Sequence, residues 1–139
     1  MIRYYGATAH QVEVIPCGVD LKLFSPQDRL QAREQLGLQP HRPVLLFAGR
    51  LDPFKGPDLL LRAASMMEEY TQIVIVGGKL TGDKELEQLQ ELAADLKISH
   101  RTHFLGARPQ EEMPMIYSAA DVTVVPSYHE ILDWPLPSR

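Results

Sequence analysis

The chain has 139 residues, of which 45% are hydrophobic and 23% charged, and this composition excludes disordered, collagen-like and low-complexity proteins. Its 18 acidic and 14 basic residues give a net charge of −4, which argues against a nucleic-acid-binding surface. The single cysteine, Cys17, excludes an internal disulfide framework, and no apolar run reaches the ~20 residues that span a bilayer, so we expect one cytoplasmic domain over residues 1–139.

Short apolar runs alternate with helical patterns along the chain. A brief strand is predicted at 12–15, and Ser25 is predicted to cap a helix that starts at Pro26 and stops at Gly37. The elements predicted after it are a strand at 43–48, a helix at 58–70, a strand at 72–76, a helix from the cap Asp83 to Lys97, a strand at 102–105, a helix at 111–120 and a strand at 121–125.

This order of about five strands and four helices predicts an α/β fold built on a parallel sheet. Continuous apolar runs such as 43–48 and 72–76 are typical of strands covered on both faces, so helices are expected on both sides. Ligands of such sheets bind beyond the carboxyl ends of the strands. The loops that form the candidate site therefore begin at Gly49, Gly77, Gly106 and Pro126.

The loop from Gly49 to Gly56 carries the clearest chemistry. Gly49 lets the backbone approach a ligand, and Gly56 leaves open the N–H groups of the following helix, which favour anions. Arg50 offers a planar guanidinium and Lys55 a compact charge, a pair suited to a diphosphate. The alternative is a surface loop whose two cations are solvated. A Walker A loop is excluded because Lys55 precedes the second glycine, and 77–82 lacks the dinucleotide fingerprint.

Five motifs carry a resemblance to a known family, and they stand at 15–20, 49–56, 74–78, 104–106 and 117–127. Together they resemble the C-terminal, donor-binding half of GT-B fold glycosyltransferases of group 1, or family 4, the glycogen-synthase and sucrose-phosphate-synthase-like enzymes. The resemblance covers nearly everything from 12 to 130. It implies a Rossmann-like parallel sheet with helices on both faces, incomplete at the C-terminus and without the acceptor domain.

The resemblance also implies roles for individual residues. In that family the Arg and Lys of the first glycine-rich loop bind the diphosphate of a nucleotide-sugar, and these positions are Arg50 and Lys55 here. Arg108 lies in a stretch that resembles the lining of the base pocket. The glycines assigned to the same donor site are Gly49, Gly78 and Gly106.

Glu130 matches the family carboxylate that contacts the donor sugar. Arg50, Lys55 and Glu130 are therefore the residues expected to act in catalysis, and Glu130 also in donor binding. The family has a second Glu that usually holds the ribose, and Ser138 stands at its position here.

The activity implied by the resemblance is transfer of a hexose from a UDP-, GDP- or ADP-sugar to an acceptor hydroxyl, with retention of configuration and without a metal or other cofactor. The acceptor would be a sugar or lipid held by an N-terminal domain that this chain lacks, so the isolated chain is expected to be inactive and to associate as a homodimer. Two alternatives stay open: a non-catalytic nucleotide-sugar-binding or interaction module, and an α/β domain for another phosphorylated ligand.

Overall fold

The computed structural model describes residues 6, 8–11, 13, 15–79 and 81–128. Four strands form one parallel sheet in the order β3–β2–β1–β4, as the α/β prediction requires. The central strand, β1, pairs with β2 along its whole length and with β4 at two positions. The strands are β1 (Val44–Ala48), β2 (Gln72–Val76), β3 (Thr102–Gly106) and β4 (Val122–Thr123).

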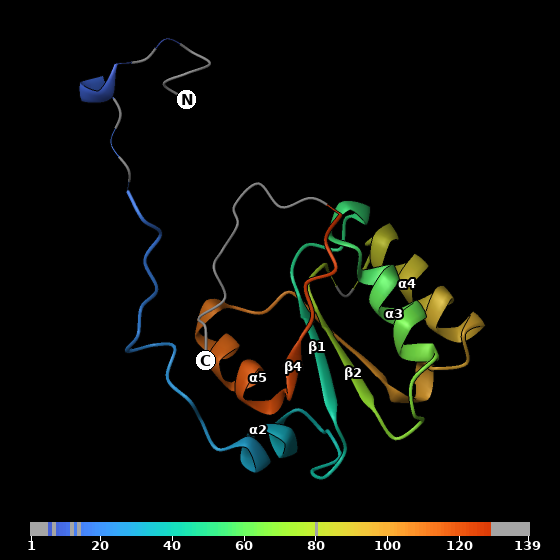
Figure 1. Cartoon of the computed structure of the whole chain (residues 1–139). Helices are drawn as coiled ribbons and strands as arrows, with labels where there is room; N and C mark the ends of the chain where they lie inside the picture. Colours follow the sequence, from blue (N-terminus) through green and yellow to red (C-terminus); the bar gives the residue numbers. More distant parts are fainter. Residues whose placement is uncertain (1–5, 7, 12, 14, 80, 129–139) are drawn as a thin grey trace.

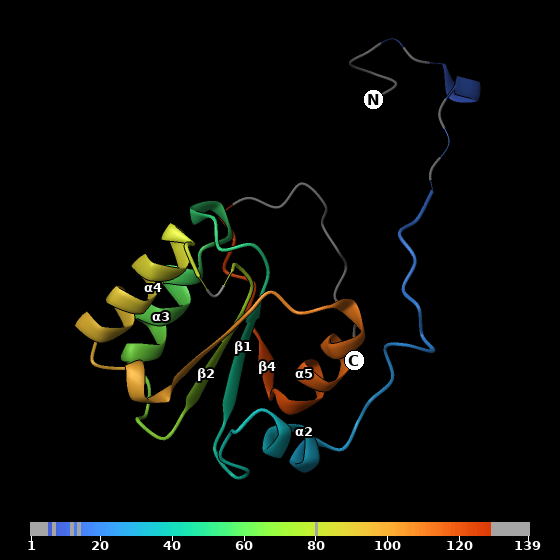
Figure 2. The ribbon, with the colours of Figure 1, turned by 180° about the vertical axis from the view of Figure 1, so that it is seen from behind.

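Helices cover both faces of the sheet, and the two opposite views show α3 and α4 on one side and α2 and α5 on the other (Figure 1, Figure 2). Side chains of β2 alternate between these layers, because successive residues of a strand point to opposite faces. Ile73 and Ile75 pack in the core with α3 and α4, whereas Val74 and Val76 pack in the core with α2 and α5. The helices are α2 (Arg29–Gln35), α3 (Pro57–Ser65), α4 (Lys84–Asp95) and α5 (Met113–Ala119). The predicted layers are confirmed.

The start of α2 differs from the prediction. Asp28, not Ser25, caps the helix, and its carboxylate accepts a hydrogen bond from the amide of Gln31 at 2.8 Å. The amide of Gln27 donates to the hydroxyl of Ser118 on α5 at 2.9 Å, a contact that holds the preceding segment outside the helix. The helix therefore begins after this contact, with Asp28 as its cap and Arg29 as its first residue.

Helix α3 is shorter than the predicted 58–70, and a distant arginine accounts for its end. Arg101, only 4% exposed, lies in the 3₁₀ turn just before β3. Its guanidinium donates to the carbonyls of Ala64 at 2.9 Å, Glu68 at 2.8 Å and Thr71 at 3.1 Å. A single side chain from another element thus bonds to the last turn of α3 and to the segment that follows it.

The predicted strand at 12–15 is wrong at the residues that can be judged. Glu13 and Ile15 lie in irregular structure, and Ile15 is 79% exposed, while the other two positions lie outside the described residues. Figure 1 shows this part of the chain running away from the sheet. A strand needs a hydrogen-bonded neighbour, and neither Glu13 nor Ile15 belongs to a strand of the sheet.

The last strand, β4, is also shorter than the predicted 121–125, and the residue before it, Asp121, bonds through its side chain as well as its backbone. Its carboxylate accepts from the amide of Val44 at 2.8 Å and from the buried guanidinium of Arg33 at 2.6 Å. These bonds tie the start of β4 to β1 and to α2. Among the described residues, no helix is long and apolar enough to cross a membrane.

Candidate functional site

Backbone hydrogen bonds join the loops at the carboxyl edge of the sheet. The amide of Gly49 donates to the last carbonyl of β2 at 3.0 Å, and the amide of Gly77 donates to the carbonyl of Gly106 at 3.0 Å. The amide of Ala107 then donates to the carbonyl of Gly78 at 2.7 Å. The loops after β1, β2 and β3 therefore form one continuous backbone surface.

The loop after β4 packs against the same edge. A Cβ atom on Gly56, whose φ is +65°, would lie 2.5 Å from the carbonyl oxygen of Pro126. A Cβ atom on Gly77 would overlap the carbonyl oxygen of Gly49. Only glycine allows these close approaches. The prediction that all four loops gather at one edge is confirmed.

A hollow of about 370 Å³ lies against the first three loops. Tyr117 and Met113, one helical turn apart on α5, form part of its wall. Sequence reasoning assigned neither to the site, although their i, i+4 spacing on the helix that follows β3 is a usable signal. Four predicted site residues also line it, namely Gly49, Arg50, Gly78 and Arg108.

The two arginines of this hollow each carry an ion pair. Arg50 Nη2 lies 3.3 Å from Asp52 Oδ2, and 82% of the Arg50 side chain is exposed. Arg108 Nη1 lies 3.2 Å from Glu112 Oε2, and its Nε donates to the carbonyl of Leu105 at 3.1 Å. Ligands can reach both guanidinium groups from solvent, and planar guanidinium groups suit phosphate oxygens.

The remaining predicted site residues are placed differently. Lys55 is half-buried in the 3₁₀ turn Pro53–Lys55, which leads through Gly56 into α3, and it does not line the 370 Å³ hollow. Gly106 ends β3 directly before Ala107, which does line it. Glu130 lies outside the described residues.

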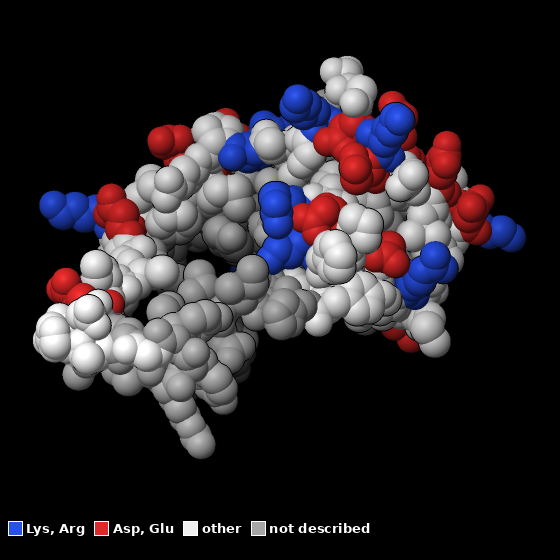
Figure 3. All heavy atoms as spheres, turned by 90° about the horizontal axis from the view of Figure 1, so that it is seen from above, with Lys and Arg blue, Asp and Glu red and all other residues white. Residues whose placement is uncertain are grey.

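Charges of both signs stand along the edge that holds this hollow. In Figure 3, which views the molecule from above Figure 1, Lys and Arg side chains stand next to Asp and Glu side chains. An extended single-sign surface is what a long polyanion requires. The visible charges fit a small, local anion site instead.

A smaller hollow of about 210 Å³ adjoins the first and shares Arg50 and Gly78 with it. Asp83 lines it and, as predicted, caps α4 by accepting from the amide of Leu86 at 3.1 Å. Asp83 also accepts from the amide of Lys79 at 2.7 Å. These two backbone bonds, that of Lys79 first, hold the pKa of the Asp83 carboxyl below its usual 3.8. Among the described residues, no three His, Cys, Asp or Glu side chains converge in a way that could hold a metal ion.

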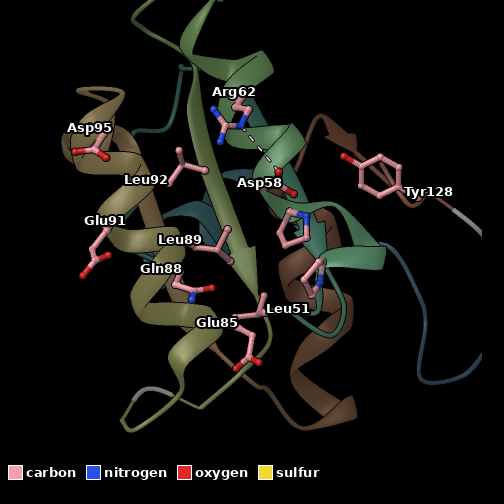
Figure 4. Close-up of a pocket in the computed structure, with 12 residues that line it drawn as sticks. Leu51, Asp58, Arg62, Glu85, Gln88, Leu89, Glu91, Leu92, Asp95 and Tyr128 are labelled. Carbon is pink, nitrogen blue, oxygen red and sulfur yellow. Dashed lines mark ion pairs between the residues drawn. The ribbon is translucent and has the colours of Figure 1, made fainter.

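The largest of these hollows, about 470 Å³, lies between α3 and α4 (Figure 4). Four carboxylates line it, and its one arginine, Arg62, is paired with Asp58 at 3.9 Å. The other three carboxylates belong to Glu85, Glu91 and Asp95 on α4. This negative surface repels a diphosphate, so the 370 Å³ hollow, which Arg50 and Arg108 line, is the better candidate for a diphosphate site.

Comparisons with known proteins identify the family and the fold. The family model described as glycosyl transferases group 1 matches residues 28–132. The D-inositol 3-phosphate glycosyltransferase of Nocardia farcinica is 41% identical over 136 residues, an alignment that covers 94% of this chain and 30% of the relative.

Two solved structures share the fold. Sucrose-phosphate synthase from Thermosynechococcus elongatus has a TM-score of 0.79 and 36% identity, over 93% of this chain and 32% of that one. Anabaena HepE, in complex with UDP and glucose, has a TM-score of 0.74 and 30% identity, over 88% of this chain and 33% of that one. The chain therefore spans about a third of the length of the proteins it matches.

Proposed function

The chain belongs to the group 1 glycosyltransferases, and from this membership we propose that it binds the donor of a nucleotide-sugar-dependent hexosyl transfer. The ligand we assign to the 370 Å³ hollow is the nucleoside diphosphate part of that donor. A UDP-sugar is the first candidate, since a structural relative at 30% identity is in complex with UDP-glucose. GDP- and ADP-sugars are the other candidates.

One observation carries the proposal: two solvent-accessible guanidinium groups line a hollow that three glycines also line. Glycines at 77 and 78 let the loops pack closely against one another, because a Cβ atom at either position would overlap Gly49 or Leu51. Arg50 and Arg108 supply donors in the planar arrangement that phosphate oxygens accept in pairs. An adenine or uracil ring would have the side chains of Met113 and Tyr117 beside it.

The proposed reaction requires positive charge beside the departing diphosphate. An acceptor hydroxyl oxygen bonds to the anomeric carbon and gives up its proton to the departing diphosphate or to water, and the bond from that carbon to the diphosphate oxygen breaks. The departing diphosphate takes the electron pair and gains negative charge. Cations beside the diphosphate stabilise this charge, and we assign that role to Arg50 and Lys55. Contact with the donor sugar is the role proposed for Glu130.

The direct test is calorimetric titration of the purified chain with UDP, GDP, ADP and their glucose conjugates. We expect one diphosphate to bind in a salt-sensitive manner, because the contacts are ion pairs at the surface. Equal lack of binding for all three diphosphates would contradict the proposal.

The 139-residue chain on its own is expected to bind the donor without transferring its sugar. Transfer requires both substrates in register, and the relatives that it matches are about three times as long. A radiolabelled-donor assay with a panel of sugar and lipid acceptors measures this. Turnover above the rate of an Arg50→Ala preparation would show that the chain alone is active.

A further inference from the structure

The carboxylate of Asp52 sits against the cation that the proposed ligand needs. Asp52 Oδ2 lies 3.3 Å from Arg50 Nη2, and both residues line the 210 Å³ hollow that adjoins the proposed donor site. An anion bound to Arg50 must therefore share its guanidinium with Asp52 or displace the carboxylate.

The fold itself gives Asp52 little to do. Asp28 and Asp83 precede helices and cap them with their carboxylates. Asp52 precedes the 3₁₀ turn Pro53–Lys55, yet its side chain makes no cap hydrogen bond. Its Oδ1 atom is buried without a hydrogen-bond partner among the described residues. A carboxylate kept in this position, with one oxygen unsatisfied, costs stability rather than adding it.

We propose that Asp52 acts through Arg50 as a positioning residue that competes with the diphosphate and so limits how tightly the nucleoside diphosphate product is retained. This inference rests on the proposed function. The carboxylate holds the guanidinium at the edge of the hollow when the ligand is absent. It opposes the ligand's negative charge when the ligand is present, which favours release of the product after the sugar has left.

The expected size follows from Coulomb's law. Two unit charges ~5 Å apart in water change a binding constant by roughly fourfold, or by roughly twofold once physiological salt screens them. The diphosphate of UDP carries more than one negative charge, so removal of the Asp52 charge should tighten UDP binding by roughly three- to tenfold. The gain should be smaller for UMP, which carries less charge, and uridine should show none.

The test compares Asp52→Asn with the parent by titration of UDP, UMP and uridine at low and high salt. Asp52→Asn keeps the size of the side chain, and Asp52→Glu keeps the charge and should bind UDP as the parent does. Asp58→Asn is the matched control, because Asp58 forms a similar ion pair, with Arg62 at 3.9 Å, and is comparably exposed. It should leave UDP binding within twofold of the parent.

A tighter UDP complex for Asp52→Asn alone, with a gain that follows ligand charge and shrinks with salt, supports the inference. Unchanged or weaker UDP binding in Asp52→Asn overturns it while leaving the proposed function intact. An equal gain for uridine, or an equal gain in Asp58→Asn, also overturns it, because neither reflects charge next to Arg50. If the parent and all variants bind no nucleotide, the proposed function fails and the inference fails with it.

Discussion

Arg50 and Lys55 lie in one loop, but their surroundings predict unequal contributions to ligand binding. Arg50 lines the 370 Å³ hollow and Lys55 does not. A guanidinium also forms paired hydrogen bonds where an ammonium forms one. We expect Arg50→Ala to weaken UDP binding by roughly ten- to a hundredfold, the equivalent of about 1.5–3 kcal/mol, and Lys55→Ala to weaken it less.

Calorimetric titration of the two variants measures this difference. Arg62→Ala is the control, since Arg62 is an exposed arginine whose partner, Asp58, lies in the groove between α3 and α4. If Arg62→Ala weakens binding as much as Arg50→Ala, the effect is one of net charge and the assignment of Arg50 is wrong.

His103, half-buried on β3, predicts a pH dependence of stability. Burial lowers the pKa of its imidazole below the usual 6.5. The unfolded chain therefore binds more protons than the folded chain as the pH drops through 6.5, and the free energy of unfolding falls in that window. We expect His103→Gln and His103→Phe both to flatten the profile between pH 7.5 and 5, measured by urea unfolding.

Asp83 affects stability in a separate, lower pH range. The pKa of its carboxyl is held below 3.8 in the folded chain, so the stability it adds is present above that pH and is lost as the pH falls through the folded value.

The test of His103 is the steepness of the profile. If the stability of His103→Gln still falls as steeply as that of the parent between pH 7.5 and 5, the assignment to His103 is wrong.

At the scale of elements, Arg101 is expected to be a main support of α3. Arg101→Met removes four hydrogen bonds to carbonyls around the end of this helix while keeping an apolar stem. We expect a loss of roughly 3–5 kcal/mol in the free energy of unfolding, because hydrogen bonds from a buried charged group are lost together. Urea or thermal unfolding measures it.

Arg29→Met is the matched control for that experiment. Arg29 also forms an ion pair, with Asp121 at 3.0 Å, but 57% of its side chain is exposed. An exposed pair contributes about 0–1 kcal/mol, so this variant should stay close to the parent. Equal losses in the two variants would show that the carbonyl contacts of Arg101 are not the cause.

The elements that the sequence predicted well are those with a local signal. The apolar runs at β1 and β2 fixed both strands, and the glycines after them identified the edge that binds ligands. The end of α3 could not be predicted, because it depends on Arg101, which lies more than thirty residues later. The start of α2 was misplaced because it depends on a contact with Ser118 of α5.

In the candidate site, too, residues with a local sequence signal were predicted and residues placed by distant packing were not. Arg50 was found because its loop carries a local motif, whereas Tyr117 and Met113 belong to the site only through the packing of α5 beside the loops. The pairing of Arg50 with Asp52 is a matter of side-chain direction within a loop. Residue spacing does not determine that direction.

For the whole molecule, the open edge of the sheet predicts self-association. Val122 and Val125 are 52% and 66% exposed, and the outer edge of β4 pairs with no strand among the described residues. Exposed apolar edges of this kind pair with other chains. We expect the mass measured by light scattering to rise with concentration, and a Val122→Lys, Val125→Lys double variant to lower it. A constant monomer mass across the range would contradict this.

The backbone bonds that join the loops at Gly49, Gly77 and Gly106 bear on how such a site can diversify. Main-chain hydrogen bonds hold these loops together, so the shape of the loop backbone depends on a few glycines and very little on the side chains between them. A side chain such as that of Arg108, which lines the hollow, can therefore be exchanged while the backbone of the loops keeps its shape. Evolution or protein engineering can in this way alter which donor is accepted without changing the architecture that presents the donor.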